Sequence, residues 1–231
     1  MLDTTKIRAI TLDLDDTLWP IWPTLERAEK ALEDWLCQHA PMTAALFANP
    51  VARHDMREQV RRSRPELKHN LSAVRREAIR LALVRSQENP LLAEPAFAVF
   101  FAERQRVDLF EDTLLALEFL SARFPVVALS NGNADVQKIG IGQYFKASIS
   151  AQEFGVGKPD PRIFHAGAGA AQVLPEQVLH VGDDALADIL GALNCGMQTV
   201  WVNRAEHSWA HEARPHVTVN TLSKLIDLFT D

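Results

Sequence analysis

Residues 10–19, with the sequence ITLDLDDTLW, constrain the fold more than any other stretch of this chain. A strand of a parallel sheet is buried on both faces, so its sequence is nearly all apolar until it reaches the surface at its carboxyl end. Asp13 and Asp15 stand at that end. Because open α/β sheets bind ligands beyond the carboxyl ends of their strands, the segment predicts a reactive site there and points to an enzyme.

Length and composition exclude several classes of protein. A chain of 231 residues with 47% hydrophobic content can build one domain with an insertion, or two modest domains. The net charge of −6 argues against non-specific nucleic-acid binding and favours a small-molecule partner. Cys37 and Cys195 have no metal or redox spacing, so we expect reduced, packed thiols. With no signal peptide and no apolar run that could cross a bilayer, the expectation is a cytoplasmic protein that binds no membrane.

Beyond Trp19 the pattern becomes helical, and Thr24 after Pro23 is a plausible N-cap for the first helix. Helical spacing is found over residues 24–36, 43–62, 70–87 and 95–107. These helices predict an inserted unit of roughly 85 residues, within the usual size of a domain.

From residue 113 onward, strand and helix patterns alternate. We expect helices at 113–123, 134–139, 161–171 and 186–193, and strands at 125–130, 147–150, 178–182, 198–202 and 217–219. Such alternation is typical of an α/β fold with a doubly wound, Rossmann-like parallel sheet. The predicted domains are a core of residues 1–18 and 109–231 and an all-helical domain of residues 19–108.

Four polar clusters lie at strand ends or in loops of the predicted core. They are residues 13–17 (DLDDT), 130–133 (SNGN), 157–159 (GKP) and 182–188 (GDDALAD). Each alone has an ordinary structural explanation: a solvated turn, a surface lysine before proline, or acids favoured at a helix start by the helix dipole. Together they supply a nucleophilic carboxylate, a second acid, hydroxyl and amide donors, a cation and a metal-binding acidic pair. Phosphoryl transfer through an aspartyl phosphate needs these groups.

On these motifs the chain resembles the phosphatases of the haloacid dehalogenase superfamily, with a helical cap inserted between the first and second motifs. That family has DxDx[TV] after an apolar strand, a Ser or Thr ending the next strand, a Lys often followed by Pro, and an acidic pair after a later strand. The matching residues are Asp13, Asp15 and Thr17, then Ser130, then Lys158, then the segment 182–188. The resemblance covers essentially the whole chain and implies a catalytically competent enzyme.

The resemblance implies a role for each of three catalytic residues. Asp13 would attack phosphorus and form an aspartyl phosphate, and Asp15 would protonate the departing alkoxide and later take a proton from water. Lys158 would offset the charge between Asp13 and the phosphate. One residue, Asp15, therefore serves both half-reactions.

The resemblance also implies a Mg²⁺ cofactor and a phosphate-binding set. The metal ligands would be the Asp13 carboxylate, the Asp15 carbonyl and the Asp183 carboxylate, with Asp184 or Asp188 acting through water and Asp188 preferred. Ser130 and the backbone N–H of Asn131 would hold phosphate oxygens, while Thr17, assigned to the same substrate site, would mainly brace the loop.

Substrate choice is expected to lie in the inserted helices, which can exclude water from the site. His69, Asn70 and Arg75 resemble a recurring cap signature of the superfamily, H(D/N)-x-(S/T)-x-x-R, so His69 and Arg75 are predicted to bind substrate; a solvated basic helix face is the alternative. Trp22 is expected to pack, whereas Trp19 could either pack or stack on a substrate ring.

Three local stretches resemble the bacterial phosphatases that act on flavin mononucleotide and on the phosphoribitylaminouracil intermediate of riboflavin synthesis. They are LDLDDTLW, LSNGNADVQKIGIGQYF and LHVGDDALADILGALNCGMQ. Related enzymes with the same catalytic set hydrolyse nucleoside monophosphates, phosphoglycolate or sugar phosphates, and the core motifs do not distinguish among them.

Four other readings compete with a phosphatase. A dehalogenase uses the same first aspartate but lacks the second, so Asp15 argues against it. A phosphosugar mutase shares every catalytic residue. A two-component receiver module carries similar groups, but its lysine follows the acidic clusters, whereas Lys158 precedes Asp183, and this chain is nearly twice too long. A non-catalytic interaction protein would be expected to have lost a motif. No protein partner is indicated.

Overall fold

A computed structural model describes residues 1–230 and divides the chain into two compact units. One unit, the core unit, comprises Met1–Pro20 and Asp108–Asp231, and the other, the helical unit, comprises Ile21–Val107. The chain therefore leaves the core unit soon after its first strand and returns to it about ninety residues later, as an insertion does.

The core unit is built on a six-stranded sheet with the order β3-β2-β1-β4-β5-β6, in which every neighbouring pair is parallel. The strands are β1 (Ala9–Leu12), β2 (Val126–Ser130), β3 (Ala147–Ser150), β4 (Val178–Gly182), β5 (Gln198–Val202) and β6 (Val217–Val219). This arrangement confirms the predicted doubly wound α/β fold.

The position of β1 between β2 and β4 decides where the polar clusters meet. Leu12, the last residue of β1, lies opposite Ala128 of β2 and Val181 of β4. Carboxyl ends of adjacent parallel strands open on the same edge of a sheet. The residues that follow β1 are therefore neighbours of those that follow β2 and β4, although more than a hundred positions of the chain separate them from either.

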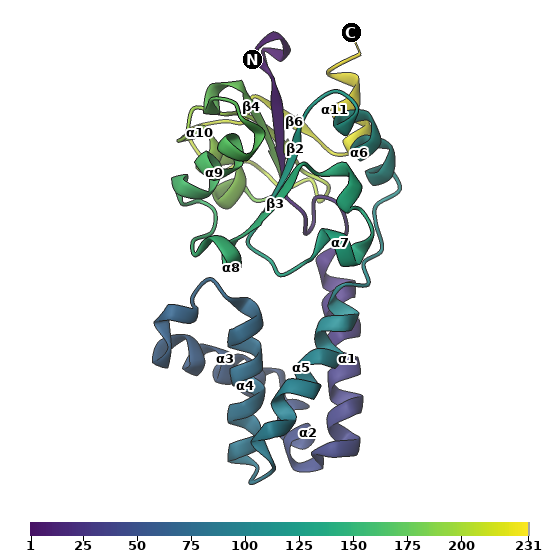
Figure 1. Ribbon diagram of the computed structural model, residues 1–231, viewed down its shortest axis with the longest axis vertical. Helices are drawn as coiled ribbons and strands as arrows, with labels where there is room; N and C mark the ends of the chain where they lie inside the picture. Colours follow the sequence, from purple (N-terminus) through teal and green to yellow (C-terminus); the bar gives the residue numbers. More distant parts are fainter. Residues whose placement is uncertain (231) are drawn as a thin grey trace. The chain divides into compact units, whose positions relative to one another are not determined.

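Helices cover both faces of this sheet. They are α6 (Thr113–Ser121), α7 (Val136–Ile139), α8 (Ala151–Phe154), α9 (Pro161–Ala171), α10 (Gly191–Leu193) and α11 (Leu222–Asp227). Figure 1 shows α9 and α10 on one side of the sheet and α6 and α11 on the other. Ile163, Phe164 and Ala168 of α9 pack with Val127 and Leu129 of β2, so apolar burial holds this layer to the strands.

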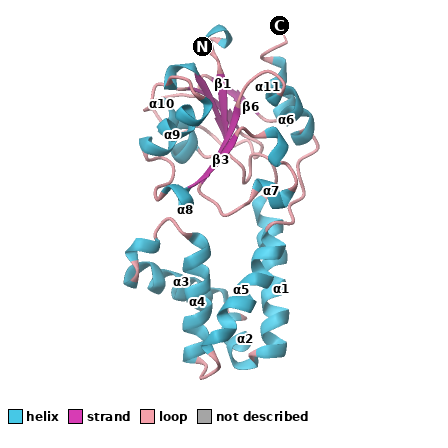
Figure 2. Ribbon diagram, in the orientation of Figure 1, coloured by secondary structure: helices cyan, strands magenta, loops and turns pink. Residues whose placement is uncertain are grey.

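The helical unit has its own apolar core. Its helices are α1 (Ile21–His39), α2 (Pro41–Phe47), α3 (Pro50–Ser63), α4 (Leu71–Arg85) and α5 (Ala93–Arg104), and Figure 2 shows the magenta strands confined to the core unit among the described residues. Ala28, Leu32 and Leu36 recur every fourth residue on one face of α1, and all are buried in this core with Ile79 and Phe100. No helix of the described residues is long and apolar enough to cross a membrane.

The prediction of one helix over residues 43–62 is wrong, because the chain breaks between α2 and α3. Pro50 has no N–H to donate to a preceding turn and disfavours helical geometry at Asn49. Asn49 instead adopts an extended conformation and caps α3, its side-chain oxygen accepting from the N–H of Val51 at 2.9 Å. Asn-Pro therefore ends one helix and starts the next.

Three further predictions about this region are also wrong. Helix α1 begins at Ile21, so Thr24 lies inside its first turn and is not its N-cap; Pro23 is tolerated there because first-turn N–H groups have no helical partner. Trp22 is 70% exposed and does not pack. Both cysteines are free thiols as predicted, but Cys37 is exposed, so its predicted packing is wrong.

Candidate active site

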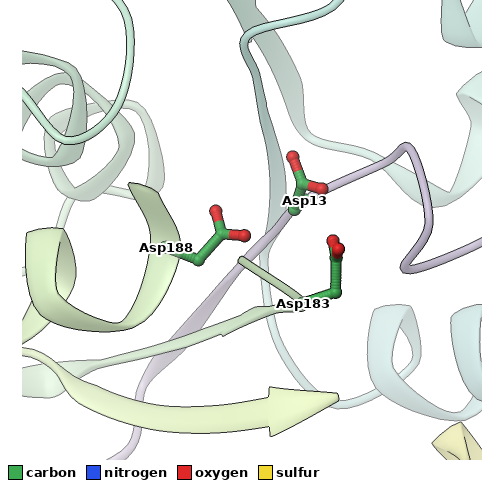
Figure 3. Close-up of side chains that lie close together, drawn as sticks. All are labelled: Asp13, Asp183 and Asp188. Atoms are coloured by element: carbon green, nitrogen blue, oxygen red, sulfur yellow. The ribbon is translucent and has the colours of Figure 1, made fainter. Parts of the chain in front are cut away.

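Three carboxylates from separate elements converge at the carboxyl edge of the sheet. Asp13 follows β1, Asp183 follows β4, and Asp188 lies in the π-helical turn η6 (Ala185–Leu190). One ligand atom of each lies within 4.8 Å of those of the other two. Figure 3 shows the three side chains facing a common space. The predicted helix 186–193 is thus a π turn continued by α10, a local geometry often found at functional sites.

Lys158 binds two of these carboxylates at once. Its Nζ contacts Asp13, and it donates to Oδ1 of Asp188 at 2.5 Å. The lysine side chain is only 2% exposed. A buried ammonium needs compensation by opposite charge, and two aspartates provide it here. Lys158, predicted from its place between the second and fourth motifs, therefore lies beside Asp13.

The backbone of Lys158 is held by Asn131, the residue after β2. The Asn131 side chain donates to the Lys158 carbonyl at 2.8 Å and accepts from the Lys158 N–H at 2.7 Å. A Cβ on the neighbouring Gly157 would lie 2.4 Å from the Asn131 Oδ1. Glycine at position 157 therefore permits the close approach that this two-bond clamp requires.

Asp188 is fixed on its other side by a buried imidazole. His180 Nε2 lies 3.2 Å from Asp188 Oδ1, and His180 Nδ1 lies 2.9 Å from the Thr11 hydroxyl oxygen. Because a carboxylate only accepts, the imidazole donates from Nε2 and accepts the Thr11 hydroxyl at Nδ1. A Cβ on Gly182 would lie 2.4 Å from Asp188 Cγ, so glycine is needed there as well.

Burial and mutual repulsion set the charges of the carboxylates. Burial, with repulsion from Asp188 and Asp183, raises the pKa of Asp13 well above its usual value against the attraction of Lys158. Burial and repulsion from Asp188 raise the pKa of Asp183 to about 7. Burial alone would also raise the pKa of Asp188, but Lys158 and His180 outweigh it and lower that pKa. Asp188 and Lys158 thus remain an ion pair, while Asp13 and Asp183 carry repulsion that a cation would relieve.

Residues 13–19 form a tight loop that ties the site together. The Thr17 hydroxyl donates to Asp183 Oδ1 at 3.0 Å, and the Trp19 indole N–H donates to Asp15 Oδ1 at 2.9 Å. Asp16 has a φ of 58°, a left-handed conformation that aspartate tolerates better than most residues. This explains a second acid in the DDT sequence by backbone conformation, without a catalytic role.

Other predicted core residues surround the same edge of the sheet. Ser130 is buried at the end of β2, and its Oγ accepts from the N–H of Gly132 at 2.9 Å. The Asp184 carboxylate caps η6 by accepting from Leu186 and Ala187, so its role in the structure is to start that turn. Thr17 is fully buried and touches Asp183; substrate contact by Thr17, Ser130 or Asn131 remains a prediction.

The donor set fits a magnesium ion. Hard divalent cations prefer oxygen ligands, and carboxylates from Asp13 and Asp183, with Asp188 nearby, supply them. Burial and repulsion between carboxylates raise the pKa values of Asp13 and Asp183, so a cation at this point would favour their ionised forms. Both oxygens of Asp188 already accept hydrogen bonds, from Lys158 and His180 at Oδ1 and from the Asp184 N–H at Oδ2. Asp13 and Asp183 are thus the better-suited ligands.

The predicted substrate residues of the insertion lie in the helical unit. Asn70 is the N-cap of α4, its Oδ1 accepting from the N–H of Ala73 at 2.8 Å. Arg75 donates to Glu29 at 2.5 Å and lies 3.7 Å above the ring of Phe100. Its side chain is 17% exposed, so the alternative of a solvated basic face does not describe Arg75. Substrate binding by His69 and Arg75 remains a prediction.

Sequence reasoning missed His180 and assigned no structural role to Gly157 and Gly182, although both glycines lie in the predicted polar clusters. His180 interrupts the apolar strand VLHVG, which is the one signal that could have found it, since a polar residue inside a buried strand needs a partner. The glycines flank Lys158 and Asp183 directly in sequence, but their necessity depends on Asn131 and Asp188, which come from other elements.

Comparison with known proteins agrees with the geometry. The family described as haloacid dehalogenase-like hydrolases matches residues 7–196. The chain belongs to this family. It is 31% identical to 5-amino-6-(5-phospho-D-ribitylamino)uracil phosphatase YigB of Escherichia coli over 96% of both chains. It is 32% identical to the phosphoserine phosphatase of Thermus thermophilus over 65% of this chain and 63% of that one.

A solved structure with a similar fold is named for a different activity from that of the phosphatase relatives. The 2-haloacid dehalogenase from Pseudomonas syringae is 34% identical, has a TM-score of 0.91, and is matched over 96% of this chain and 98% of that chain. Family membership confirms the predicted resemblance and the prediction that the chain is an enzyme. With phosphatases among its relatives, the chain is a hydrolase of the phosphoric monoester class.

Proposed function

We propose that this protein is a Mg²⁺-dependent phosphatase of small organic phosphate monoesters that works through an aspartyl phosphate on Asp13. The observation that carries the proposal is the cluster of Asp13, Asp183 and Asp188, with Lys158 bound to the first and last of these and the second acid, Asp15, in the same loop as Asp13. This set combines a nucleophile, a proton donor and positive charge at one place.

In the first half-reaction the ester oxygen leaves as an alcohol. A carboxylate oxygen of Asp13 forms a bond to phosphorus while the bond from phosphorus to the ester oxygen breaks. The Asp15 carboxyl gives its proton to that oxygen, so an alcohol departs and an aspartyl phosphate remains. Lys158, already in contact with Asp13, orients the attacking carboxylate and stabilises the transferring phosphoryl group.

In the second half-reaction water removes the phosphoryl group. Asp15, now ionised, takes one proton from the water, whose oxygen bonds to phosphorus as the acyl phosphate bond breaks. Hydrogen phosphate departs, Asp13 is again a carboxylate and Asp15 is again protonated. A magnesium ion, held by Asp13, the Asp15 carbonyl and Asp183 with Asp188 behind them, would supply charge neutralisation for the phosphate.

The remaining core residues bind and orient. Ser130 and the backbone N–H of Asn131 would donate to non-bridging phosphate oxygens, and the Asn131 side chain keeps Lys158 in place. The helical unit would act as a cap that excludes water and selects the substrate, with His69 and Arg75 as substrate contacts. We place the enzyme in the cytoplasm, acting on a free metabolite.

The substrate we favour is flavin mononucleotide or the phosphorylated ribitylaminouracil intermediate of riboflavin synthesis. The support is the relative YigB, which covers nearly the whole chain, together with three local stretches similar to that branch. Nucleoside monophosphates, sugar phosphates and phosphoglycolate are the alternatives, because the core motifs serve all of these substrates.

A 2-haloacid dehalogenase is the second candidate, favoured by the named structure at 34% identity. In that reaction Asp13 would attack carbon and displace a halide, with no need of a proton donor for the leaving group. Asp15 argues against it, because a second carboxyl group two residues from the nucleophile can act as a general acid. An alkoxide leaving group needs that proton, and a halide does not.

One experiment separates these functions. The purified chain is assayed with Mg²⁺ for phosphate release from flavin mononucleotide, the ribitylaminouracil phosphate, a sugar phosphate and p-nitrophenyl phosphate, and for chloride release from L-2-chloropropionate. We expect phosphate release, loss of it on chelation, and its return with Mg²⁺. Asp13→Asn should abolish it, whereas Asp34→Asn, which changes an aspartate exposed on α1, should not. Chloride release without phosphate release, or a fully active Asp13→Asn variant, would overturn the proposal.

A further inference from the structure

The indole of Trp19 binds the carboxyl group of Asp15. The Trp19 Nε1–H donates to Asp15 Oδ1 at 2.9 Å, and the whole tryptophan residue is 0% exposed. Asp15 itself is partly exposed. A buried, rigid ring thus holds a side chain at the border between the core of the protein and the site.

The loop geometry shows that this contact is built in. The Asp16 N–H donates to the Trp19 carbonyl at 2.8 Å, and Asp15 and Trp19 form an isolated bridge, so the chain folds back on itself between them. The next turn is pinned as well, because the Leu18 carbonyl accepts from the Thr113 hydroxyl at 2.7 Å and from the Phe110 N–H at 3.0 Å. The indole can therefore move little without disturbing the loop.

The chemistry of the indole determines which oxygen of Asp15 accepts the hydrogen bond and which oxygen carries the proton. An indole N–H donates and never accepts, so the carboxyl oxygen that it binds must be an acceptor. In a neutral carboxyl group the carbonyl oxygen is a stronger acceptor than the hydroxyl oxygen, so when Asp15 carries its proton the indole favours that proton on the other oxygen, Oδ2. Fixing one oxygen also fixes the plane of the carboxyl group, and proton transfer requires donor and acceptor in hydrogen-bond reach and alignment.

We infer that Trp19 is a positioning residue for proton transfer: its indole N–H holds Oδ1 of Asp15 and directs the transferred proton to Oδ2, toward the leaving group. The inference rests on the proposed phosphatase function and deepens it. Trp19 acts through Asp15, so it need not touch the substrate.

The test uses leaving groups of different basicity. An alkoxide is a poor leaving group and needs the proton from Asp15, whereas p-nitrophenolate leaves without one. In the variant Trp19→Phe, which keeps a buried ring and loses the N–H, kcat/KM for an alkyl phosphate should fall about tenfold or more, with less than about a twofold change for p-nitrophenyl phosphate. Because kcat/KM reports the steps up to the first irreversible one, the shared hydrolysis of the aspartyl phosphate does not mask the difference.

Two further variants make the result specific. Trp209→Phe removes another indole hydrogen bond of the core unit, the one to the Ala213 carbonyl at 3.0 Å, and should leave the ratio of the two kcat/KM values unchanged. Asp15→Asn should shift this ratio strongly, and adding Trp19→Phe to Asp15→Asn should shift it no further. If Trp19→Phe fails to fold, a variant with benzothienylalanine at position 19 takes its place in the same assays, because this residue keeps the shape of the ring system and lacks the N–H.

The outcomes separate the inference from the function on which it rests. A selective loss on the alkyl phosphate supports the inference. An equal loss on both substrates, no loss on either, or an additional ratio shift in the Asp15→Asn background overturns it while leaving the phosphatase function intact. Absence of phosphate release by the unaltered protein would overturn the function itself, and the inference with it.

Discussion

In the core unit three carboxylates lie together and two of them bind one ammonium group, whereas in the helical unit one carboxylate binds guanidinium groups from neighbouring helices. The first cluster is Asp13, Asp183, Asp188 and Lys158. The second is Glu29 of α1 with Arg75 of α4 and Arg57 of α3, and Arg53 lines the same pocket. One cluster has negative charge in excess and the other has positive charge in excess.

The two clusters differ in what their charges do to each other. In the helical unit, burial would raise the pKa of Glu29, but Arg75 and Arg57 outweigh it and lower that pKa, so the pairing stabilises the fold. In the core unit, burial and repulsion raise the pKa values of Asp13 and Asp183, so keeping both carboxylates ionised is costly unless a cation offsets their charge. Buried charge in the helical unit thus serves stability, and buried charge in the core unit serves chemistry.

The largest effect on activity is expected from adding one methyl group at Gly182, next to the charge cluster of the core unit. A Cβ there would lie 2.4 Å from Asp188 Cγ, so Gly182→Ala must displace Asp188 and with it Lys158. We expect kcat/KM for the best phosphate substrate to fall about 100-fold, because small misplacements of catalytic groups have effects of that size.

Gly169 provides the matched control for Gly182→Ala. Among the described residues, no atom beyond its chain neighbours and the nearby backbone of α9 itself lies within 4 Å of a Cβ built at this position, so Gly169→Ala should keep full activity. It should also raise the free energy of unfolding by about 0.5–1 kcal/mol, because alanine is the better helix former. Full activity in Gly182→Ala would show that Asp188 and Lys158 do not need their present positions.

The next effect should appear in the helical unit and, with a generic substrate, in stability alone. Glu29→Gln leaves the buried Arg75 without its carboxylate, and we expect a loss of about 2 kcal/mol in the free energy of unfolding, less than for a fully buried pair because both side chains are partly exposed. Urea denaturation measures this, and kcat for p-nitrophenyl phosphate should be unchanged. Because Arg75 is also a proposed substrate contact, the KM of the natural substrate should rise as well. A rise in KM with little change in stability would mean that the pair does not stabilise the helices.

A smaller effect is expected from His180, which joins the core site to the sheet. His180→Leu removes the donor to Asp188 and leaves one oxygen less well held, so kcat should fall about tenfold, the size expected for one hydrogen bond to a charged group. His180→Gln keeps an N–H donor on the side chain and should retain more activity. Equal activity in the two variants would mean that His180 fills space and does not orient Asp188.

The site of the core unit was largely predictable because its polar residues break apolar strand patterns. Asp13, Ser130 and Asp183 each stand where a buried strand reaches the surface, and parallel topology brings such ends together. What could not be predicted are contacts between separate elements. Nothing near His180 in sequence indicates that it binds Asp188 and Thr11 at once.

The helical unit was predictable in class but not in its contacts. The periodicity of α1, α4 and α5 identified helices, yet the pairing of Glu29 with Arg75 joins residues 46 positions apart and leaves no local pattern. The break at Asn49–Pro50 was visible in the sequence and was missed because apolar spacing continues across it. Apolar periodicity reports which face is buried, and it does not report which polar groups meet there.

The smallest expected effect is the pH dependence of the stability that Glu29 contributes, and it tests whether the charge cluster of the helical unit acts by electrostatics. The pKa of Glu29 is lowered from 4.5 in the folded protein, so the folded state favours its ionised form. Its contribution is therefore fully present above pH 4.5 and is lost as pH falls through the lowered pKa. The groups that set this behaviour are Arg75 of α4 and Arg57 and Arg53 of α3.

The measurement compares the free energy of unfolding of the wild type with that of Glu29→Gln at neutral pH and at several values below 4.5. The advantage of the wild type should shrink as pH falls through the lowered pKa of Glu29, because protonation removes the charge that Arg75 and Arg57 bind in the folded state. Glu176→Gln, which changes an exposed carboxylate of the core unit, should show no comparable trend. An advantage that stays constant below pH 4.5 would mean that Glu29 stabilises the helices by packing, and the contrast between the two charge clusters would lose its electrostatic basis.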